Sequence, residues 1–525
     1  MELKDTVLGI EFGSTRIKAV LLDRDHRPIA SGAHDWENRL IDGIWTYTMD
    51  DIHLGLQDCY AKLKEDVKEK FGCALTEVGA IGVSAMMHGY LPFDKNWKQL
   101  AGFRTWRNTM TGPAAEKLSE LFNFNIPQRW CIAHLYQAIL NGEDHVKDIA
   151  HLTTLAGYIQ YRLCGKDVMG IGEASGVFPI NDDTRDYDEK MMKDFNELIA
   201  DKALPWKIRD ILPDHLVAGE VAGHLTEDGA RLLDPTGELK AGIPIAPCEG
   251  DAGTGMVATC SVRPGTGNVS AGTSDFAMLV TDHALGVHKE VGMVTTPAGA
   301  PVAMVHCSNC TSDINSWVAL LLEFAELIGE PQKKEDLFTL LFIKSLEGEK
   351  DCGGLLSYNY FSGESVTELD EGRPVFLRLP DAKLDLANFM RMHLFSALAT
   401  LKVGLDILIK EENVRIDRIF GHGGYFKTPG VGQRYLSAAI ASPVSVMETA
   451  GEGGPYGMAL LCAYMLWKDE GESLEDYLDH KVFNNSPVST VMAGEDDIEG
   501  FRKFTERYVN SFEVERAAVR TLKEE

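Results

Sequence analysis

Two short turns that combine glycine with hydroxyl residues have the composition of phosphate-binding loops. The first is Gly13-Ser14-Thr15, within the stretch LGIEFGSTRIKAVLLD. It does not match a dinucleotide fingerprint, which needs three spaced glycines before a helix, or a P-loop, which needs Lys-Ser or Lys-Thr at a helix mouth. The alternating apolar residues after Thr15 predict a second strand and therefore a hairpin. The backbone N–H groups of such a turn can bind an anion without a helix.

The second turn, Gly272-Thr273-Ser274, repeats this pattern within NVSAGTSDFAMLVTD. In each copy an apolar run follows the turn and ends at an Asp ten positions after the glycine, at Asp23 and Asp282. The glycines are 272 − 13 = 259 residues apart, close to half of the 525-residue chain. This internal similarity predicts two related domains with their turns facing one cleft. It also favours phosphate binding over two ordinary hairpins.

Two acidic residues, Glu11 and Asp251, occupy positions in the sequence that suggest a functional carboxylate. Glu11 lies inside the first predicted strand, where burying an acid is costly. Asp251 stands between glycines in CEGDAGTG, and two interpretations apply to it. It could cap the following helix, MVATCSV. It could also accept a proton from a hydroxyl that attacks a phosphoryl group, and its place between the two hairpins favours this second role.

The elements that position these residues alternate between helices and strands, which indicates an α/β fold. A helical pattern ending at Gly72 precedes the buried strand of EVGAIGVSAMMHGYLPFD. Residues 113–165 are predicted to be mainly helical. Glycine and proline in PIAPCEGDAGTGMVATCSVRPGTG mark a junction, so the predicted domains are 1–256 and 257–525.

The second half contains a long amphipathic helix, LANFMRMHLFSALATLKVGLDILIKE. The strand VRIDRIF and a glycine-rich loop follow it. The tail beyond Gly471 is predicted to be acidic and helical. Its aromatic stripe, formed by Phe501, Phe504, Tyr508 and Phe512, is typical of packing rather than of a partner site.

The net charge of −28 excludes proteins that wrap nucleic acid or lie on anionic lipid, because both need a basic surface. A phosphate ligand must therefore be held locally, by backbone N–H groups and a metal ion. The start, MELKDTV, lacks the features of a signal peptide, and no uncharged stretch approaches the ~18 residues of a membrane span. The ten scattered cysteines indicate reduced thiols and a cytoplasmic location, with Cys307 and Cys310 as small buried thiols rather than a zinc or redox site.

Five motifs in order, GIEFGSTRIK, VSAMMHGYLPFD, EGDAGTG, VSAGTSD and GHGGYF…GEGGPYG, resemble those of the FGGY carbohydrate kinases. That family belongs to the actin, sugar kinase and Hsp70 fold superfamily, and the resemblance covers nearly the whole chain. It implies two ribonuclease H-like (actin-like ATPase) domains with an interdomain cleft. It also implies ATP and Mg²⁺ as cofactors and Asp251 as the general base.

The resemblance assigns further roles residue by residue. The metal would be held by Glu11 and Asp251 through water. The ATP phosphates would be bound by the two hairpins and the adenosine by the late glycine loops. The implied ATP-binding residues are Gly13, Ser14, Thr15, Lys18, Gly272, Thr273, Ser274, Gly423, Gly424, Lys427 and Gly453.

Within the family, MMHGY is most similar to the xylulokinases, whose Met-His pair contacts the ketose. The implied substrate-binding residues are Met87, His88, Trp106, Asn108 and Asp251. A core histidine whose hydrogen bonds are satisfied is the alternative for His88. The implied substrate is a xylulose-like ketopentose or a related sugar or polyol.

Four positions depart from the pattern of the xylulokinases. Glu11 replaces an Asp, Met86 replaces a Gln, and Asn108 and Met110 replace the Asp and Arg of a Trp-x-Asp-x-Arg motif. These changes put the identity of the sugar in question. Two other functions stay open, an actin-like ATP-binding switch and a family member without sugar kinase activity. The oligomeric state, including a homodimer, also stays open.

Overall fold

The computed structural model describes residues 2–447, 453–484 and 486–523, and the chain folds into two compact units. The first unit contains residues 1–262, 293–302 and 452–485; the second contains 263–292, 303–451 and 486–525. The sequence predicted a single boundary between residues 256 and 257. The observed division comes after Val262, and two later segments return to the first unit because they pack on its elements.

The first unit is built on a mixed sheet with the strand order β13–β14–β6–β1–β2–β3, and β15 also pairs with β6. The predicted hairpin is confirmed as β1 and β2, which are antiparallel, and β6 runs parallel to β1. Its strands are β1 (Val7–Phe12), β2 (Arg16–Leu22), β3 (Pro28–Asp35), β6 (Ala80–Ala85), β13 (Gly223–His224), β14 (Pro244–Ile245) and β15 (Glu249–Gly250).

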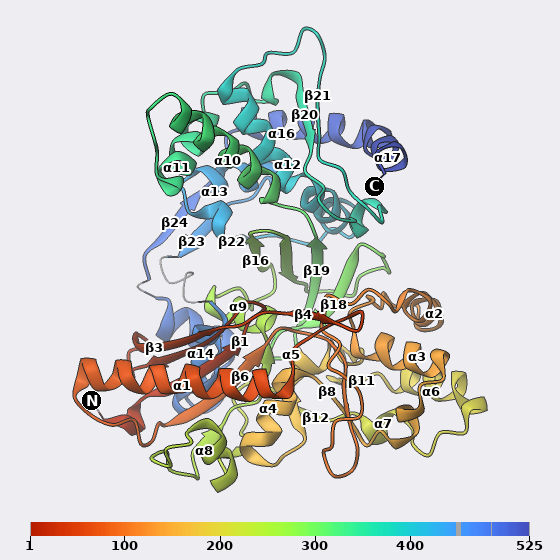
Figure 1. The fold of residues 1–525 in the computed structure, drawn as a ribbon, viewed down its shortest axis with the longest axis vertical. Coiled ribbons are helices and arrows are strands. Elements are labelled where there is room, and N and C mark those ends of the chain that lie inside the picture. Colours follow the sequence, from red (N-terminus) through yellow and green to blue (C-terminus); the bar gives the residue numbers. More distant parts are fainter. Residues whose placement is uncertain (1, 448–452, 485, 524–525) are drawn as a thin grey trace. The chain divides into compact units, whose positions relative to one another are not determined.

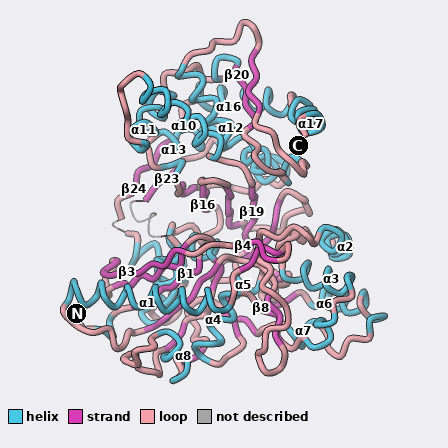
Figure 2. Tube along the Cα trace, in the orientation of Figure 1, coloured by secondary structure: helices cyan, strands magenta, loops and turns pink. Residues whose placement is uncertain are grey.

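Helices α1 (Met49–Phe71) and α14 (Gly454–Trp467) pack closely on this sheet (Figures 1 and 2). Glycines allow the close approach. A Cβ at Gly32 would lie 2.2 Å from the Cys59 carbonyl oxygen of α1, and one at Gly9 would lie 2.0 Å from the Pro455 carbonyl oxygen of α14. The packing of α14 against β1 explains why a segment close to the C-terminus belongs to the first unit.

The remaining elements of this unit surround the sheet. The predicted helical region 113–165 is largely confirmed, although it also contains the short strand β8 (His151–Thr153). The other helices are α2 (Gly112–Phe122), α3 (Cys131–Asn141), α4 (Leu155–Cys164), α5 (Ile171–Ala174), α6 (Glu189–Leu198), α7 (Ile208–Ile211), α8 (Glu227–Leu233), α9 (Asp251–Ala258) and α15 (Leu474–Tyr477). The other strands are β4 (Arg39–Ile41), β5 (Ile44–Thr46), β7 (Leu91–Phe93), β9 (Val168–Gly170), β10 (Ile180–Asn181), β11 (Asp186–Tyr187) and β12 (Asp214–Leu216).

The second unit repeats the central topology of the first. Its antiparallel hairpin is β16 (Thr266–Ala271) and β17 (Asp275–Val280), and β22 (Arg418–His422) runs parallel to β16. The full strand order is β18–β19–β17–β16–β22–β23–β24. The remaining strands of the sheet are β18 (Val291–Thr295), β19 (Pro301–Cys307), β23 (Val444–Met447) and β24 (Val488–Val491). The shared hairpin-plus-parallel-strand pattern confirms the internal similarity that the two turns predicted.

The long amphipathic helix of the sequence is α12 (Leu386–Asp406), and it forms the core of the second unit. A Cβ at Gly404 would lie 2.4 Å from the Val305 side chain of β19. Among the described residues, one helical segment, residues 386–411, is long and apolar enough to cross a membrane, and 72% of its apolar window is buried inside the protein. That burial is typical of a core helix.

The tail is helical as predicted, but it also contains the unpredicted strand β24. Phe501, Phe504 and Tyr508 are buried, which confirms that the aromatic stripe is packing. The other helices of the second unit are α10 (Ser312–Leu327), α11 (Lys334–Ser345), α13 (Val431–Ile440), α16 (Glu495–Asn510) and α17 (Phe512–Thr521), and its short two-stranded sheet pairs β20 (Leu355–Tyr358) with β21 (Val375–Arg378).

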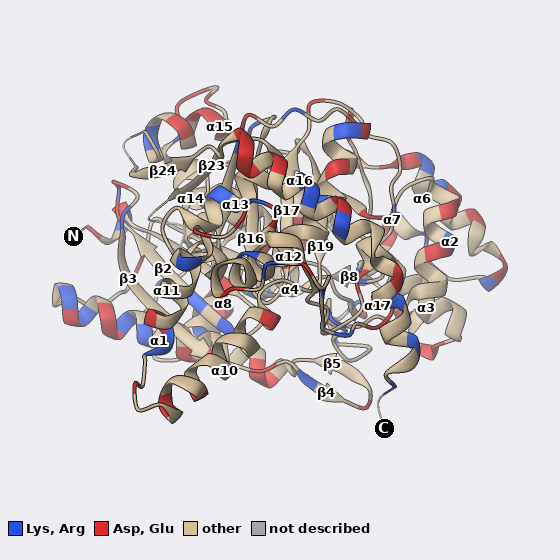
Figure 3. Cartoon of the chain, turned by 90° about the horizontal axis from the view of Figure 1, so that it is seen from above, with Lys and Arg blue, Asp and Glu red and all other residues tan. Residues whose placement is uncertain are grey.

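The charged residues and the cysteines occupy different parts of the chain, and nine of the ten cysteines are buried. Acidic and basic residues are interspersed along helix α1 (Figure 3). All ten cysteines are free thiols, and burial raises the pKa of Cys307 and Cys310 well above its ordinary value. Within the described ranges no group of three or more His, Cys, Asp or Glu residues has the arrangement of a metal site.

Candidate active site

The first turn presents backbone N–H groups outward. The Gly13 N–H closes the turn on the Arg16 carbonyl at 3.0 Å. The N–H groups of Ser14 and Thr15 have no acceptor among the residues that the structure describes, and both residues reach the surface. Lys18, which the resemblance placed on this hairpin, lies opposite Glu11 in the strand register. The turn therefore has free donors and a nearby cation, both suited to an anion.

The second turn has the same arrangement. The Gly272 N–H donates to the Ser274 carbonyl at 2.9 Å, and the described part of the chain offers no acceptor to the N–H groups of Thr273 and Ser274. The carbonyl oxygens of Gly272 and Thr273 accept hydrogen bonds from the N–H groups of Thr311 and Cys310, both at 2.9 Å. Because these two carbonyl oxygens point toward residues 310 and 311, the N–H groups of Thr273 and Ser274 in the same peptide units point the opposite way.

Neither turn glycine has a positive φ. What glycine provides is space. A Cβ at Gly272 would have its nearest neighbour at 4.0 Å, whereas a Cβ at Gly13 would lie 3.0 Å from the Arg16 carbonyl oxygen. An added methyl group at Gly272 is therefore tolerated by the protein itself and would meet only a ligand at the turn.

Asp251 is the first residue of α9, and its side chain contacts a distant loop. Its Oδ1 accepts a hydrogen bond from the Met87 N–H at 3.1 Å. The N-cap of α9 is Gly250, which makes no side-chain capping bond. Burial raises the pKa of Asp251 to about 6, and the backbone N–H bond from Met87 opposes this rise. A carboxylate with a pKa near 6 is ionised and basic enough to accept a proton near neutral pH.

Glu11 lies close enough to Asp251 for the two carboxylates to interact. Burial raises the pKa of Glu11 to about 7, the charge of Asp251 adds to this rise, and Lys18 opposes it. The carboxylate also touches the start of α14, because a Cβ at Gly454 would lie 2.2 Å from Glu11 Oε1. The structure thus places close together the two acids to which the resemblance assigned the metal.

Two further acids, Glu173 and Glu249, lie beneath Asp251, and the sequence analysis missed both. They are fully buried, and Glu249 accepts a hydrogen bond from the Glu173 N–H at 2.9 Å. Burial raises the pKa of Glu173 to about 8, with a smaller contribution from Asp251, and it raises the pKa of Glu249 well above its ordinary value. Glu173 is therefore mainly protonated near pH 7. The available sequence indication was an acid two residues before Asp251.

Glycines make the space for this buried pair. Cβ atoms at Gly170 and Gly172 would lie 2.2 and 2.3 Å from the Glu249 carboxylate oxygens, and one at Gly250 would lie 2.6 Å from Glu173 Oε2. The carboxyl groups thus fill positions that side chains would otherwise occupy, directly behind the backbone of Asp251.

The Met87-His88 loop follows β6 and lies beside this acid cluster. Both residues are largely buried, and His88 has φ +72, a conformation in which histidine is tolerated better than most residues. The His88 ring stacks on Trp130 with centroids 5.8 Å apart, and its Nδ1 lies 3.5 Å from the Gly176 carbonyl oxygen. The hydrogen bond from the Met87 N–H to Asp251 brings these two predicted site residues together.

Trp106 and Asn108 come from the next loop and make different contacts. The Trp106 indole N–H donates to Ser14 Oγ at 3.3 Å, which connects this loop to the first turn. The Asn108 side chain is buried and bonded to backbone. Its Oδ1 accepts the Trp45 N–H at 2.9 Å, and its Nδ2 donates to the carbonyls of Trp45 and Thr105. In this structure the Asn108 amide holds the β4–β5 hairpin.

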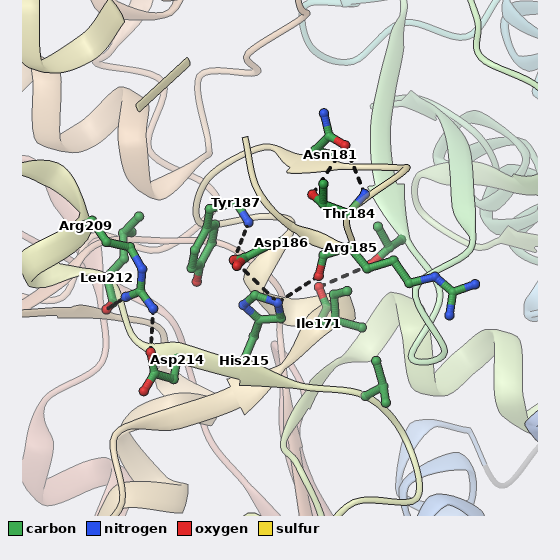
Figure 4. A network of polar contacts seen from close by, with 12 residues as sticks. Ile171, Asn181, Thr184, Arg185, Asp186, Tyr187, Arg209, Leu212, Asp214 and His215 are labelled. Carbon is green, nitrogen blue, oxygen red and sulfur yellow. Dashed lines mark hydrogen bonds and ion pairs between the residues drawn. The ribbon is translucent and has the colours of Figure 1, made fainter. Parts of the chain in front are cut away.

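A polar network lies next to Ile171, the first residue of the short helix α5 that carries Glu173 (Figure 4). The Thr295 hydroxyl donates to the Ile171 carbonyl at 3.2 Å, and His215 Nε2 donates to the Arg185 carbonyl at 2.9 Å. Arg209 donates to Asp214 at 2.5 Å and lies over the Tyr187 ring. Of these contacts, only the hydrogen bond to Ile171 holds α5 itself.

The late glycine loops fall in different units. Gly423, Gly424 and Lys427 belong to the second unit, where a Cβ at Gly423 would lie 2.4 Å from the Ala271 carbonyl oxygen at the end of β16. Gly453 belongs to the first unit and precedes α14. The preceding residues of that loop, 448–452, lie outside the described residues.

Comparison with known proteins identifies the family. Residues 6–258 match the N-terminal domain of the FGGY family of carbohydrate kinases, and residues 267–466 match its C-terminal domain. The xylulose kinase of Haemophilus influenzae is 23% identical over 424 residues, which cover 75% of this chain and 79% of that protein.

Two solved structures share the fold. Ligand-bound xylulose kinase from Lactobacillus acidophilus has a TM-score of 0.78 and 15% identity, covering 98% of this chain and 99% of that one. Plasmodium falciparum glycerol kinase with ADP has a TM-score of 0.74 and 16% identity, covering 99% of each chain. The resemblance based on five motifs is confirmed, and the chain belongs to the FGGY family of carbohydrate kinases.

Proposed function

We propose that this protein transfers the γ-phosphoryl group of ATP to a hydroxyl of a ketopentose or a related sugar or polyol, with Asp251 as the general base. The hydrogen bond from the Met87 N–H to Asp251 carries this proposal, because it fixes the carboxylate beside the Met87-His88 loop. The N-cap of α9 is Gly250 rather than Asp251, so Asp251 is not the residue that caps this helix. The raised pKa of about 6 for Asp251 suits proton acceptance near neutral pH.

The proposed reaction is an in-line displacement. The Asp251 carboxylate accepts the proton of the acceptor hydroxyl, and the hydroxyl oxygen forms a bond to the γ-phosphorus. The bond between that phosphorus and the β–γ bridging oxygen breaks, and ADP leaves with the electron pair. In phosphoryl transfer of this kind the protein contributes mainly positioning and electrostatic stabilisation.

Each of the two glycine turns would bind phosphate oxygens of ATP. The N–H groups of Ser14 and Thr15 in the first turn, and of Thr273 and Ser274 in the second, have no acceptor among the described residues and suit phosphate oxygens. Lys18 adds a positive charge on the first hairpin. Gly423, Gly424 and Lys427 of the second unit, and Gly453 of the first, remain the residues proposed to contact adenosine.

The residues present fit a Mg²⁺ ion. Mg²⁺ is usually held by one or two carboxylates together with waters and substrate phosphates, and Glu11 and Asp251 supply two interacting carboxylates. Bound there, the ion would neutralise charge on the transferred phosphoryl group. Glu11 has one methylene more than the Asp that the family usually carries, so the carboxylate reaches further from β1.

The acceptor would contact Met87, His88 and Trp106. Trp106 offers an apolar plane and His88 a polar ring, which together suit a carbohydrate. Asn108, also predicted to bind the acceptor, would first have to release the Trp45 and Thr105 backbone groups. We therefore propose that Asn108 supports this wall and that His88 is its main polar contact.

An ADP-release assay tests the function. Purified protein with Mg²⁺ and ATP is incubated with single ketopentoses, glycerol, other polyols and aldonates, and without acceptor. One acceptor is expected to stimulate release strongly over the acceptor-free rate. Slow release that no acceptor changes would support the ATP-binding switch, and no release at all would support a member without kinase activity. We place this activity in the cytoplasm, consistent with ten free thiols.

A further inference from the structure

The first glycine turn has every one of its three carbonyl oxygens bound by the segment that follows β2. The Trp36 indole N–H donates to the Gly13 carbonyl at 2.7 Å, and the Tyr47 hydroxyl donates to the Ser14 carbonyl at 2.6 Å. The Trp36 backbone N–H donates to the Thr15 carbonyl at 3.1 Å. Two aromatic residues therefore account for all three bonds.

These two aromatic residues form a rigid support, which we call the aromatic bracket (Trp36 and Tyr47). Their rings stack with centroids 4.0 Å apart and an interplanar angle of 23°. Trp36 also contacts Phe12 at the end of β1, with centroids 5.9 Å apart. Tyr47 is 2% exposed, and burial raises the pKa of its hydroxyl to about 12, so the hydroxyl remains a donor at neutral pH.

The bracket determines which way the turn's N–H groups face. A peptide unit is planar, so fixing the direction of a carbonyl oxygen fixes the opposite direction of the N–H in the same unit. The Gly13 carbonyl shares its peptide with the Ser14 N–H, and the Ser14 carbonyl shares its peptide with the Thr15 N–H. These are the two N–H groups that have no acceptor among the described residues.

The carbonyl oxygens of the second turn are also held by hydrogen bonds, but from different donors. Its Gly272 and Thr273 carbonyls are bound by the backbone of Cys310 and Thr311, with no aromatic side chain involved. The Thr311 hydroxyl adds a further bond to the Gly272 carbonyl at 2.6 Å. Two unrelated sets of donors thus leave equivalent pairs of N–H groups free, which argues that the orientation of these groups is the feature that matters.

We propose that Trp36 and Tyr47 are positioning residues for the ATP phosphates, acting by holding the carbonyl oxygens of Gly13 and Ser14 so that the Ser14 and Thr15 N–H groups face the nucleotide. This inference rests on the proposed function, because it presumes that the first turn binds phosphate. Neither side chain needs to touch ATP.

The test compares the affinity for ATP with the affinity for adenosine, both measured by calorimetry. Tyr47→Phe removes one hydroxyl and keeps the ring stack. Because a single neutral hydrogen bond is involved, we expect ATP affinity to fall by about 3- to 10-fold while adenosine affinity is unchanged. Trp36→Phe removes the indole N–H and should have the same selective effect.

Tyr60→Phe is the matched control. Tyr60 is equally buried on α1, and its hydroxyl has no hydrogen-bond partner in the described structure, so its removal should leave both affinities unchanged. Thermal unfolding of all three variants identifies any that fail to fold. The Trp36 variant then tests the inference if the Tyr47 variant does not fold.

Three results would overturn the inference. Both bracket variants could be folded and bind ATP as tightly as the wild type. They could also lose affinity for ATP and adenosine equally, which would indicate a general structural role. The third result, a wild type that binds no ATP, would overturn the proposed function itself and is thereby distinguished from the first two.

Discussion

At the scale of single residues, the chemistry depends on a carboxylate whose proton affinity the fold has changed. Asp251 is expected to act only as a proton acceptor, so Asp251→Asn should leave ATP affinity nearly intact. Loss of a general base commonly lowers the rate by about 10²- to 10⁴-fold, and we expect kcat to fall within that range. Steady-state kinetics with the best acceptor measures this. A variant that keeps more than a tenth of the activity would show that Asp251 is not the base.

The pH dependence follows from the same group. The pKa of Asp251 is raised to about 6 and that of the interacting Glu11 to about 7. Because the base must be ionised, kcat/KM should be constant above about pH 8 and fall as pH decreases through 7 to 6. The two carboxylates interact, so the apparent midpoint belongs to the pair. A profile that stays flat down to pH 5 would contradict this assignment.

Glu173 predicts an effect on stability rather than on rate. Its pKa is raised in the folded state to about 8, so its contribution to stability is full below the ordinary pKa near 4.5 and is lost as pH rises through 8. Glu173→Gln keeps the shape and the neutral form. The melting temperature of the variant should therefore exceed that of the wild type at pH 8, with a smaller difference at pH 5. An equal difference at both pH values would show that ionisation of Glu173 is not involved.

At the scale of elements, the two units share a hairpin with a glycine turn, and the glycine of the second turn can be substituted without a steric clash. Gly272→Ala adds a methyl group whose nearest neighbour is 4.0 Å away and does not require a positive φ. Stability should therefore be unchanged while the KM for ATP rises, because the methyl group would meet the phosphates. Gly102→Ala, at an open loop glycine of the first unit that also lacks a positive φ, is the matched control and should change neither quantity. Unchanged ATP kinetics in the folded Gly272 variant would remove the second turn from the ATP site.

At the scale of the whole molecule, the proposed function requires the acceptor and ATP to bind cooperatively. Closure around both ligands is common among kinases, so a bound acceptor should lower the Kd of a non-hydrolysable ATP analogue. His88→Ala should reduce acceptor affinity strongly, because a polar contact to a hydroxyl is lost, and should leave the affinity for the analogue alone unchanged. Calorimetry with and without acceptor measures both quantities.

His53→Ala is the control for this experiment, since His53 lies on α1 and pairs with Tyr158. Acceptor affinity that is equal in the wild type and the His88 variant would show that the acceptor binds elsewhere. Acceptor binding that leaves the affinity for the analogue unchanged would contradict the cooperative closure.

The sequence by itself determined the repeated hairpins, the α/β class and the family. The strands and turns follow from local patterns, because alternating apolar residues form strands and glycine with hydroxyl residues forms a phosphate-type turn. The family follows from the order of five motifs, which can be recognised even where overall sequence identity is low. The burial of the aromatic tail residues and of Cys307 and Cys310 could also be predicted, because apolar spacing and small thiols report burial directly.

Only the tertiary structure decided which groups meet. Asp251 contacts a backbone N–H 164 positions away, α14 returns to pack on β1, and Glu173 and Glu249 are buried behind Asp251. It also showed that the Asn108 amide is bonded to backbone and that Trp36 and Tyr47 hold the first turn. The physical reason is that a side chain's partners and its pKa depend on desolvation and on neighbours brought together by folding. Sequence spacing records neither.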